Sequence, residues 1–318
     1  MPTSVFAAGV RRLGLVVVLL ATSGCEPLEA APGPEPLVPS THALKELNTP
    51  NGLSLNGLSL NGLSLNGLSL NGLSLNGLSL QGLTTAEFDT WFQMNPELHD
   101  AVMKYVVRCA VPAEVSRTYT SATTGRTWRW TGMLGLAPDW SNGAPATRAE
   151  QRIISACLAA HVDKYELHIS ISVQGLSATG VAIPTPDREL RLYSEKEACF
   201  FGNAFNAEGI YAGNDGRLLN DRESTARACA LSSRRGAEEQ PCAPLVRVEQ
   251  DCGRFCTLDA ARRFYVSCTY NGISYPAITT RMLPSDIYTC GDGTCQVTEK
   301  CGTGESYDNC GRDCGPCP

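Results

Sequence analysis

Cys157 and His161 are the first candidates for chemistry in this chain, because they lie four residues apart in a segment predicted to be helical. On a helix this spacing places a thiol and an imidazole one turn apart on the same face, which suits a nucleophile with its base or two ligands of a metal ion. A disulfide role for Cys157 is the competing interpretation, and His161 falls at the end of the predicted helix. His168 falls on the polar side of a predicted strand, where it would be solvated. We therefore predict neither catalysis nor metal binding from these residues.

Other catalytic signals are scarce in this sequence. The chain has 4 His, and one of them, His42, lies in a proline-rich segment. It contains no G-x-S-x-G, no H-E-x-x-H and no phosphate-binding loop. We assign no catalytic residue, and the sequence favours a protein that is not an enzyme. A secreted hydrolase stays open as an alternative.

The cysteines predict export. The chain has 15 Cys, and if Cys25 is set aside the rest fall into two even groups, eight between Cys109 and Cys268 and six between Cys290 and Cys317. Even groups are expected of disulfides in an oxidising compartment. The predicted disulfide cysteines are Cys109, Cys157, Cys199, Cys229, Cys242, Cys252, Cys256, Cys268, Cys290, Cys295, Cys301, Cys310, Cys314 and Cys317. We expect pairing within each group, and for one pair we predict Cys109 with Cys157, which would join two predicted helices.

The amino end reads as an export signal. Arg11 and Arg12 precede an apolar run over residues 13–21, which is too short to span a bilayer, and small residues lead into Cys25. This site resembles the processing site of bacterial lipoproteins, and the resemblance implies that Cys25 is lipidated and becomes the first residue. The expected location is the outer membrane or the cell surface, with the membrane as partner through the lipid. Cleavage by an ordinary signal peptidase is the alternative.

The last 33 residues form a second candidate site. Six Cys between Cys290 and Cys317 predict a small disulfide knot. The pattern resembles C-G-D-G-x-C modules of bacterial surface proteins. Oxygen-bearing side chains between the cysteines would suit Ca²⁺, and Asp292 and Asp313 are the first choices as ligands. Solvated acids between crosslinks are the alternative, and calcium is the one possible cofactor. The side chains considered are Asp292, Glu299, Glu305, Asn309 and Asp313.

Three tryptophans could bind a ligand through their rings. Trp128, Trp130 and Trp140 could form an exposed aromatic platform for a glycan, or they could be core residues, which is the commoner role.

Helix signals concentrate in the first half of the region after residue 83. Thr84 with Glu87 predicts a capping box for a short helix. Asn95 followed by Pro96 predicts the start of a second helix, which Pro112 would end. Thr147 with Glu150 predicts a capping box for a third.

Strand signals lie between the predicted helices and after them. Residues 114–120 and 126–132 predict a hairpin, and residues 167–174 alternate as a half-buried strand. A strand near 190–193, loops pinned by disulfides over 221–253 and a turn at 214–216 are also expected. A closing hairpin over 264–270 and 273–280, around Asn271-Gly272, completes the prediction. The fold class predicted is α+β, a single disulfide-rich domain with N-terminal helices and antiparallel strands.

A five-residue repeat precedes this domain. NGLSL occurs six times over residues 51–80, and Gln81-Gly82-Leu83 follows as a degenerate copy. The period excludes an amphipathic helix, and the unit resembles a pentapeptide repeat, which implies a β-like structure. A spacer that partly docks on its neighbour, an independent solenoid and a self-associating β-zipper stay open.

Five segments result from this reading of the chain. They are a signal peptide (1–24), a lipid-anchored Pro-rich tether (25–50), the NGLSL repeat (51–83), an α+β payload domain (84–285) and a cysteine-rich module (286–318).

Charge and resemblance limit the function classes. The formal net charge is −6 and basic residues form only short pairs, so nucleic acid is not expected as a partner. The NGLSL array, the predicted helix pair and the stretch 197–205, EACFFGNAF, resemble lipoproteins of myxobacteria, a resemblance that implies no particular activity. We expect a surface-displayed envelope lipoprotein that acts in binding or adhesion, with a glycan or an envelope protein as partner. A structural envelope component that assembles through its repeat is the alternative.

Overall fold

A computed structural model describes the folded part of the chain. The chain divides into two compact units, residues 1–39 and 40–318, and all described residues belong to the second. The predicted signal, Cys25, the tether and most of the repeat lie outside the described residues. The structure describes residues 54–55, 58–59, 80–163, 170–206, 208–216, 245–248, 251–287, 289–296, 299–306 and 309–318.

The fold is α+β, as predicted, with helices, mostly antiparallel sheets and a cluster of disulfides at the C-terminal end. Three helices open the domain: α2 (Leu80–Leu83), α3 (Ala86–Met94) and α4 (Pro96–Ala110). Among the residues described, none of the helices combines the length and the hydropathy that crossing a bilayer requires.

The helix caps follow the sequence signals with one correction. The N-cap of α3 is Thr85, whose hydroxyl accepts a hydrogen bond from the amide of Phe88, so the prediction of Thr84 was one residue early. Asn95 caps α4 with Pro96 in its first turn, as predicted. The helix ends before Pro112, because the residue that precedes a proline is driven out of the α region.

Strands β3 (Ser116–Thr120) and β4 (Thr127–Thr131) form the predicted hairpin. After the short helix α5 (Pro138–Ser141), helix α6 (Arg148–Ala160) begins with the predicted capping box of Thr147 and Glu150. Helix α6 carries an almost continuous buried surface from Ile153 onward, and it packs against the main sheet.

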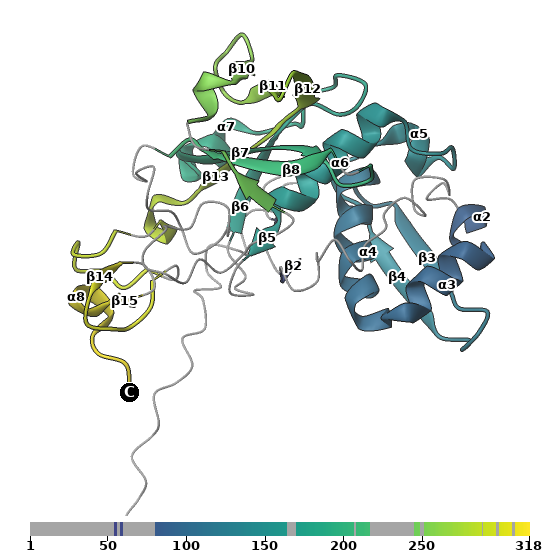
Figure 1. Ribbon diagram of the computed structural model, residues 1–318, viewed down its shortest axis with the longest axis horizontal. Helices are drawn as coiled ribbons and strands as arrows, with labels where there is room; N and C mark the ends of the chain where they lie inside the picture. The colour runs from purple at the N-terminus through teal and green to yellow at the C-terminus, as the bar shows by residue number, and fades with distance from the viewer. Residues whose placement is uncertain are drawn as a thin grey trace, which may run out of the picture. The chain divides into compact units, whose positions relative to one another are not determined.

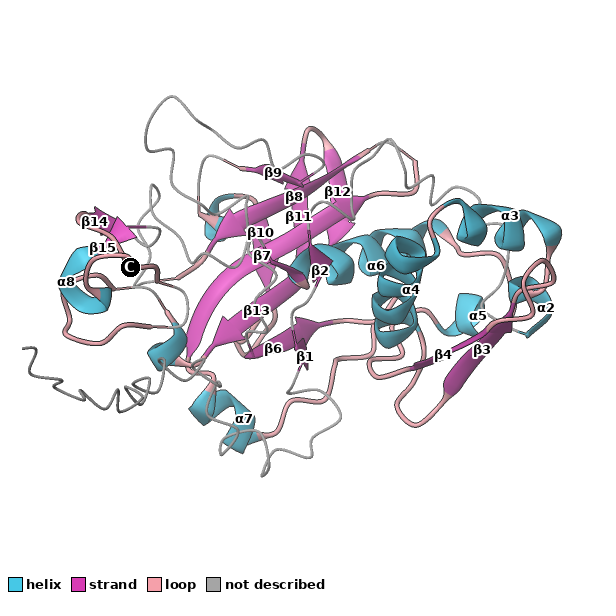
Figure 2. Ribbon diagram, turned by 90° about the horizontal axis from the view of Figure 1, so that it is seen from below, coloured by secondary structure: helices cyan, strands magenta, loops and turns pink. Residues whose placement is uncertain are grey.

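The main sheet has six strands in the order β1-β6-β13-β7-β8-β9, and Figure 2 shows them side by side. One face packs on α6, which lies against β7 in Figure 1. The other face packs on a three-stranded sheet and forms a second, smaller core. The strands are β1 (Ser54–Leu55), β6 (Ser170–Gly175), β13 (Ile278–Met282), β7 (Glu195–Asn203), β8 (Gly209–Asn214) and β9 (Leu245–Arg247).

Two differences from prediction concern this sheet. Strands β7 and β8 were not predicted, and β9 lies in a stretch expected to be loop. Strand β6 was predicted as half-buried, but Ser172 and Gln174 are as buried as Ile171 and Val173. The polar side of β6 is buried because chain segments distant in sequence pack over it. The first residues of the predicted strand, with His168, lie outside the described residues.

The smaller sheet consists of β10 (Cys256–Leu258), β11 (Tyr265–Tyr270) and β12 (Ile273–Pro276). The predicted hairpin is present, and Asn271 and Gly272 both have positive φ, as a type I′ turn requires. Its second strand is divided, because the chain leaves the smaller sheet at Pro276 and enters the main sheet as β13. One predicted strand thus serves two sheets.

Residues 190–193 were predicted as a strand, and this was wrong. They belong to helix α7 (Asp187–Leu192) and its C-cap Tyr193. Pro186 precedes the helix with an extended backbone, and Asp187 and Glu189 occupy its first turn, where negative charge is favoured.

Two copies of the repeat contact the domain. Strand β1 pairs antiparallel with β6, and β2 (Leu58–Ser59) pairs in parallel with β5 (Val162–Asp163). The rest of the repeat lies outside the described residues, so its structure stays a prediction.

The C-terminal region is small and crosslinked. It contains a two-stranded sheet of β14 (Glu305–Ser306) and β15 (Asn309–Cys310), followed by α8 (Gly311–Cys314). Short 3₁₀ turns lie at Cys252–Arg254 (η3) and Pro284–Asp286 (η4).

Candidate functional site

The thiol–imidazole pair does not form a reactive site. Cys157 is bonded to Cys109, which is the pair that we predicted, so it has no free thiol. His161 is the C-cap of α6 and fully buried, and its Nδ1 lies 2.8 Å from the carbonyl oxygen of Cys157. His161 is therefore a core residue that contacts the end of its own helix.

The remaining disulfides also follow the two predicted groups. All cysteines of the described region pair within their own group, and Cys229 and Cys242 lie outside that region. The bonds are Cys109–Cys157, Cys199–Cys252, Cys256–Cys268, Cys290–Cys310, Cys295–Cys314 and Cys301–Cys317.

The three tryptophans are core residues and form no exposed platform. The rings of Trp128 and Trp130 pack around Phe92, and the Trp130 indole donates a hydrogen bond of 2.7 Å to Asp100. Trp140 is fully buried elsewhere in the same core. Of the two alternatives for these residues, the core role is confirmed.

In the structure, the acids predicted as calcium ligands accept hydrogen bonds from backbone amides. The Asp313 carboxylate accepts hydrogen bonds from the amides of Gly291, Asp292 and Gly293. The Asp292 carboxylate accepts from the Thr294 amide and from the side chain of Gln296. Each carboxylate therefore stabilises the first loop of the module, and calcium binding stays a prediction.

The other three oxygen donors are divided between two places. Glu299 accepts from the amides of Gln296 and Thr289, near the same loop. Glu305 pairs with Arg312 at 3.7 Å, and Asn309 contacts the backbone of the 303–304 turn.

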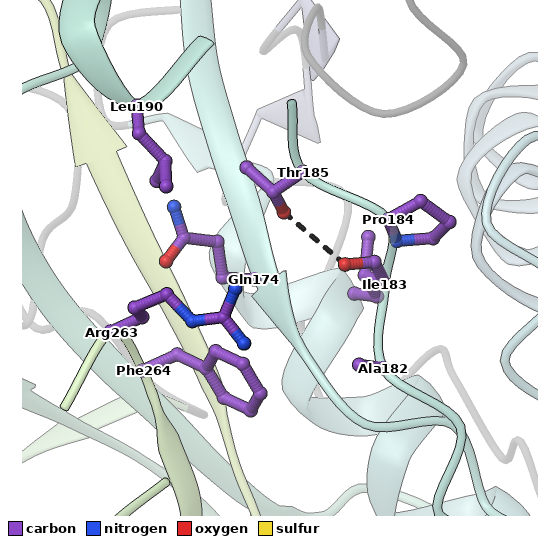
Figure 3. A pocket seen from close by; sticks show the side chains of 8 residues that line it. All are labelled: Gln174, Ala182, Ile183, Pro184, Thr185, Leu190, Arg263 and Phe264. Carbon is purple, nitrogen blue, oxygen red and sulfur yellow. Dashed lines mark hydrogen bonds between the residues drawn. The ribbon is translucent and has the colours of Figure 1, made fainter. Parts of the chain in front are cut away.

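A pocket opens over the polar side of β6, the side that was expected to face solvent. Its volume is about 150 Å³, and it lies between β6, residues 182–185 with Leu190 of α7, and the segment before β11 (Figure 3). Ile183, Leu190 and Phe264 supply apolar walls, and Gln174 and Arg263 supply polar groups. The lining residues are Gln174, Ala182, Ile183, Pro184, Thr185, Leu190, Arg263 and Phe264.

A row of buried polar side chains lies beneath this pocket. Arg281 Nε donates to Gln174 Oε1 at 3.3 Å, and Gln174 Nε2 donates to Ser172 Oγ at 3.4 Å. Ser172 in turn donates to Glu189 at 2.5 Å. Ser172, Gln174 and Glu189 are each at most 1% exposed, so these groups depend on one another for hydrogen bonds. The row fixes the orientation of the Gln174 amide in the pocket.

The electrostatics of the pocket differ between its floor and its rim. Burial raises the pKa of Glu189, an effect that the hydrogen bond from Ser172 partly offsets. Burial likewise lowers the pKa of Arg281, whose guanidinium also donates to two backbone carbonyls. Arg263 is at the rim, where its side chain is 50% exposed and contacts Asp259. Arg263 is therefore the cation that a ligand would meet.

The arrangement offers a ligand apolar walls and hydrogen-bond donors. Within the described part of the chain, His99 and His161 pack in the core on the α6 side of the sheet, so no imidazole activates Ser172. The hydroxyl of Ser172 donates to Glu189 instead.

The pocket was missed by sequence reasoning. Gln174 was expected to face solvent, Leu190 was placed in a strand, and Arg263 lies in a segment 89 residues after Gln174. The paired basic residues 262–263 were the one available signal, and their pattern did not indicate a pocket.

Comparisons with known proteins give no family for this chain. A scan against protein-family models finds no match, and searches of curated proteins and of solved structures find none either.

Proposed function

We propose that this protein is an exported, lipid-anchored envelope protein of the kind that myxobacteria carry, displayed at the outer membrane or cell surface, which acts by binding. Its ligand is a small carboxylate, either free or at the end of an envelope glycan or peptide. The single observation that carries the binding proposal is the pocket over β6, with a buried amide and a rim guanidinium beside apolar walls.

The chemistry of the lining supports this ligand class. The guanidinium of Arg263 and the amide of Gln174 are donors that suit a carboxylate. Ile183, Leu190 and Phe264 suit a short apolar group attached to it. A volume of about 150 Å³ limits the buried part of the ligand to a few heavy atoms.

The disulfides support export. Cytosolic thiols are kept reduced, whereas six disulfides in the described region suit an oxidising compartment. Cys25 is the proposed lipid attachment point, because small residues precede it and because it leaves an even number of cysteines.

Mass spectrometry of the mature N-terminus tests the anchor. We expect a diacylated peptide that begins at Cys25, and loss of the lipid in Cys25→Ser. An unlipidated peptide that begins after Cys25 would show that the anchor is absent.

Ligand-observed NMR with a panel of small carboxylates, including sugar acids and short peptides, tests the pocket. We expect binding that Arg263→Ala weakens at least about tenfold, since charge-assisted hydrogen bonds to a carboxylate contribute about 1.5–3 kcal/mol. Arg262→Ala is the matched control, because this exposed neighbour does not line the pocket. Equal binding by both variants would exclude this pocket as the site. A comparison of free carboxylic acids with carboxylates at the end of a glycan or peptide distinguishes the two sources of the ligand.

A further inference from the structure

Two disulfides contact each other where the main sheet faces the smaller sheet. Cys199 of β7 is bonded to Cys252 of η3, and Cys256 of β10 is bonded to Cys268 of β11. The Sγ atoms of Cys256 and Cys199 are 3.7 Å apart. The Sγ atom of Cys268 also lies within 4.8 Å of both. Sulfur atoms of two separate bonds are thus in contact, the arrangement from which thiol–disulfide exchange proceeds.

The two bonds differ in access from solution. Cys199, Cys252 and Cys268 are fully buried. Cys256 is partly exposed on β10, which is an edge strand of the smaller sheet. A thiol in solution therefore meets Cys256 before it meets any other of these sulfur atoms.

The buried bond is closely enclosed by its surroundings. The amide of Cys199 lies 3.1 Å from Cys252 Sγ. Gly213 lies opposite Cys199 on β8, where a Cβ atom would come within 3.0 Å of both sulfur atoms. Within the described part of the chain the bond is thus crowded from the side of β7 and β8, and Cys256 contacts it from the side of β10.

We propose that Cys256–Cys268 is a reactive site for small thiols and that its reduction is passed on to Cys199–Cys252 by exchange. A thiolate RS⁻ attacks Cys256 Sγ, forms a mixed disulfide there and releases the Cys268 thiolate. A second RS⁻ attacks the R sulfur of the mixed disulfide, which gives RSSR and the Cys256 thiolate. Cys256 Sγ then attacks Cys199 Sγ, the Cys199–Cys256 bond forms, and Cys252 leaves as a thiolate that takes up a proton.

The balance is two thiols oxidised to one disulfide and one protein disulfide reduced. Cys252 and Cys268 end as thiols, and the covalent link of η3 to β7 is replaced by a link of β10 to β7. The co-reactant is a low-molecular-weight thiol, and no other oxidant or reductant is needed.

Brief treatment of the oxidised full-length protein with reduced glutathione, followed by acid quenching and alkylation, tests this proposal. Trypsin cuts after Lys and Arg, so the four cysteines fall on four peptides, residues 197–217, 248–254, 255–262 and 264–281. We expect a glutathione adduct on peptide 255–262 first. A disulfide between peptides 197–217 and 255–262 should follow, with alkylated Cys252 and Cys268.

The double variant Cys256→Ser with Cys268→Ser is the control for direct reduction. It lacks the attacking thiol, and we expect alkylation of Cys252 to be at least about tenfold slower, because a nucleophile held in contact reacts at a high effective concentration. Equal rates in the variant and the unaltered protein would overturn the proposal. So would a time course in which Cys256 and Cys268 are alkylated and no peptide 197–217 becomes linked to 255–262.

The disulfide between peptides 197–217 and 255–262 is measured in the unaltered protein, so the test does not depend on the folding of the variant. Cys109–Cys157 is the internal reference. Both cysteines are fully buried, and among the described Cys, His, Asp and Glu side chains only His161 is grouped with their sulfur atoms. We expect this bond to stay intact throughout the treatment.

Discussion

The hydroxyl of Ser172 donates a hydrogen bond of 2.5 Å to Oε1 of Glu189, and this bond joins the main sheet to helix α7. The second carboxylate oxygen of Glu189 is buried and has no hydrogen-bond partner among the described residues. A buried carboxylate with one oxygen unpaired is costly when it is ionised. The floor of the pocket is therefore sensitive to pH.

We expect stability to fall as pH rises through the titration of Glu189. Burial raises its pKa above the ordinary value of 4.5, so the folded state binds more protons than the unfolded state between the two values. This penalty is absent below the unfolded pKa and complete above the folded one. In Glu189→Gln the fall should be smaller, as measured by urea unfolding from pH 4 to pH 8. Asp187→Asn, an exposed acid of the same helix, should keep the slope of the unaltered protein, and an unchanged slope in Glu189→Gln would contradict the assignment.

Glu150 holds two elements together. Its Oε1 accepts hydrogen bonds from the amides of Asp139 and Trp140 at the start of α5, and its Oε2 accepts from Thr147 at the start of α6. Glu150→Ala removes the acceptor of all three donors, of which the Trp140 amide is buried, and we expect a loss of about 2–3 kcal/mol in the free energy of unfolding. Chemical denaturation measures it. Glu97→Ala, at an exposed first-turn position of α4, should lose less than about 1 kcal/mol, and a similar loss in both variants would refute the role of Glu150.

Gly213 leaves room for the buried disulfide. A Cβ atom there would lie 3.0 Å from the sulfur atoms of both Cys199 and Cys252 and 3.2 Å from Val248. Neither sulfur can move freely, so we expect Gly213→Ala to destabilise the oxidised protein by about 1–3 kcal/mol. Thermal unfolding measures the change. Gly253→Ala is the matched control, since its Cβ would meet nothing closer than 3.8 Å, and an equal effect of both would exclude crowding as the cause.

Calcium binding by the C-terminal module can be tested on the whole mature protein. A cation at Asp292 and Asp313 must compete with the amides that now donate to these carboxylates. We expect weak binding, with a Kd of about 10⁻⁴ to 10⁻³ M by calorimetry, and no binding in the double variant Asp292→Asn with Asp313→Asn. Glu97→Gln, an exposed acid of α4, should bind like the unaltered protein. Equal heats from the unaltered protein and the double variant, or none from either, would contradict calcium binding. These acids would then serve only to accept hydrogen bonds from the loop.

Local signals predicted the parts of the fold that local interactions decide. Asn95 before Pro96, Thr147 with Glu150, and Asn271-Gly272 each specify a backbone geometry within four residues, and each has the predicted structure. The fold class was predicted from local helix and strand signals, and the grouping of the cysteines from their even numbers in two parts of the chain.

Long-range packing determines the elements and the pocket that could not be predicted from the sequence. Strand β7 carries Glu195 and Glu197 among apolar residues, and both acids are buried, which hides the usual alternation. Helix α7 is short, and its buried Glu189 contacts a strand rather than solvent. The pocket combines β6 with segments up to 90 residues later in the chain, so no window of the sequence contains it.

The docked repeat has a consequence for the length of the chain that leads to the domain. Strands β1 and β2 come from two consecutive copies, and a shift of five residues would present the same residues to β6 and β5. Backbone pairing cannot distinguish identical copies, so chain connectivity alone selects which pair docks. Each shift transfers five residues, about 17 Å of extended chain, from one side of the contact to the other. We therefore expect the reach of the preceding chain to change in equal steps of five residues if the docking register shifts.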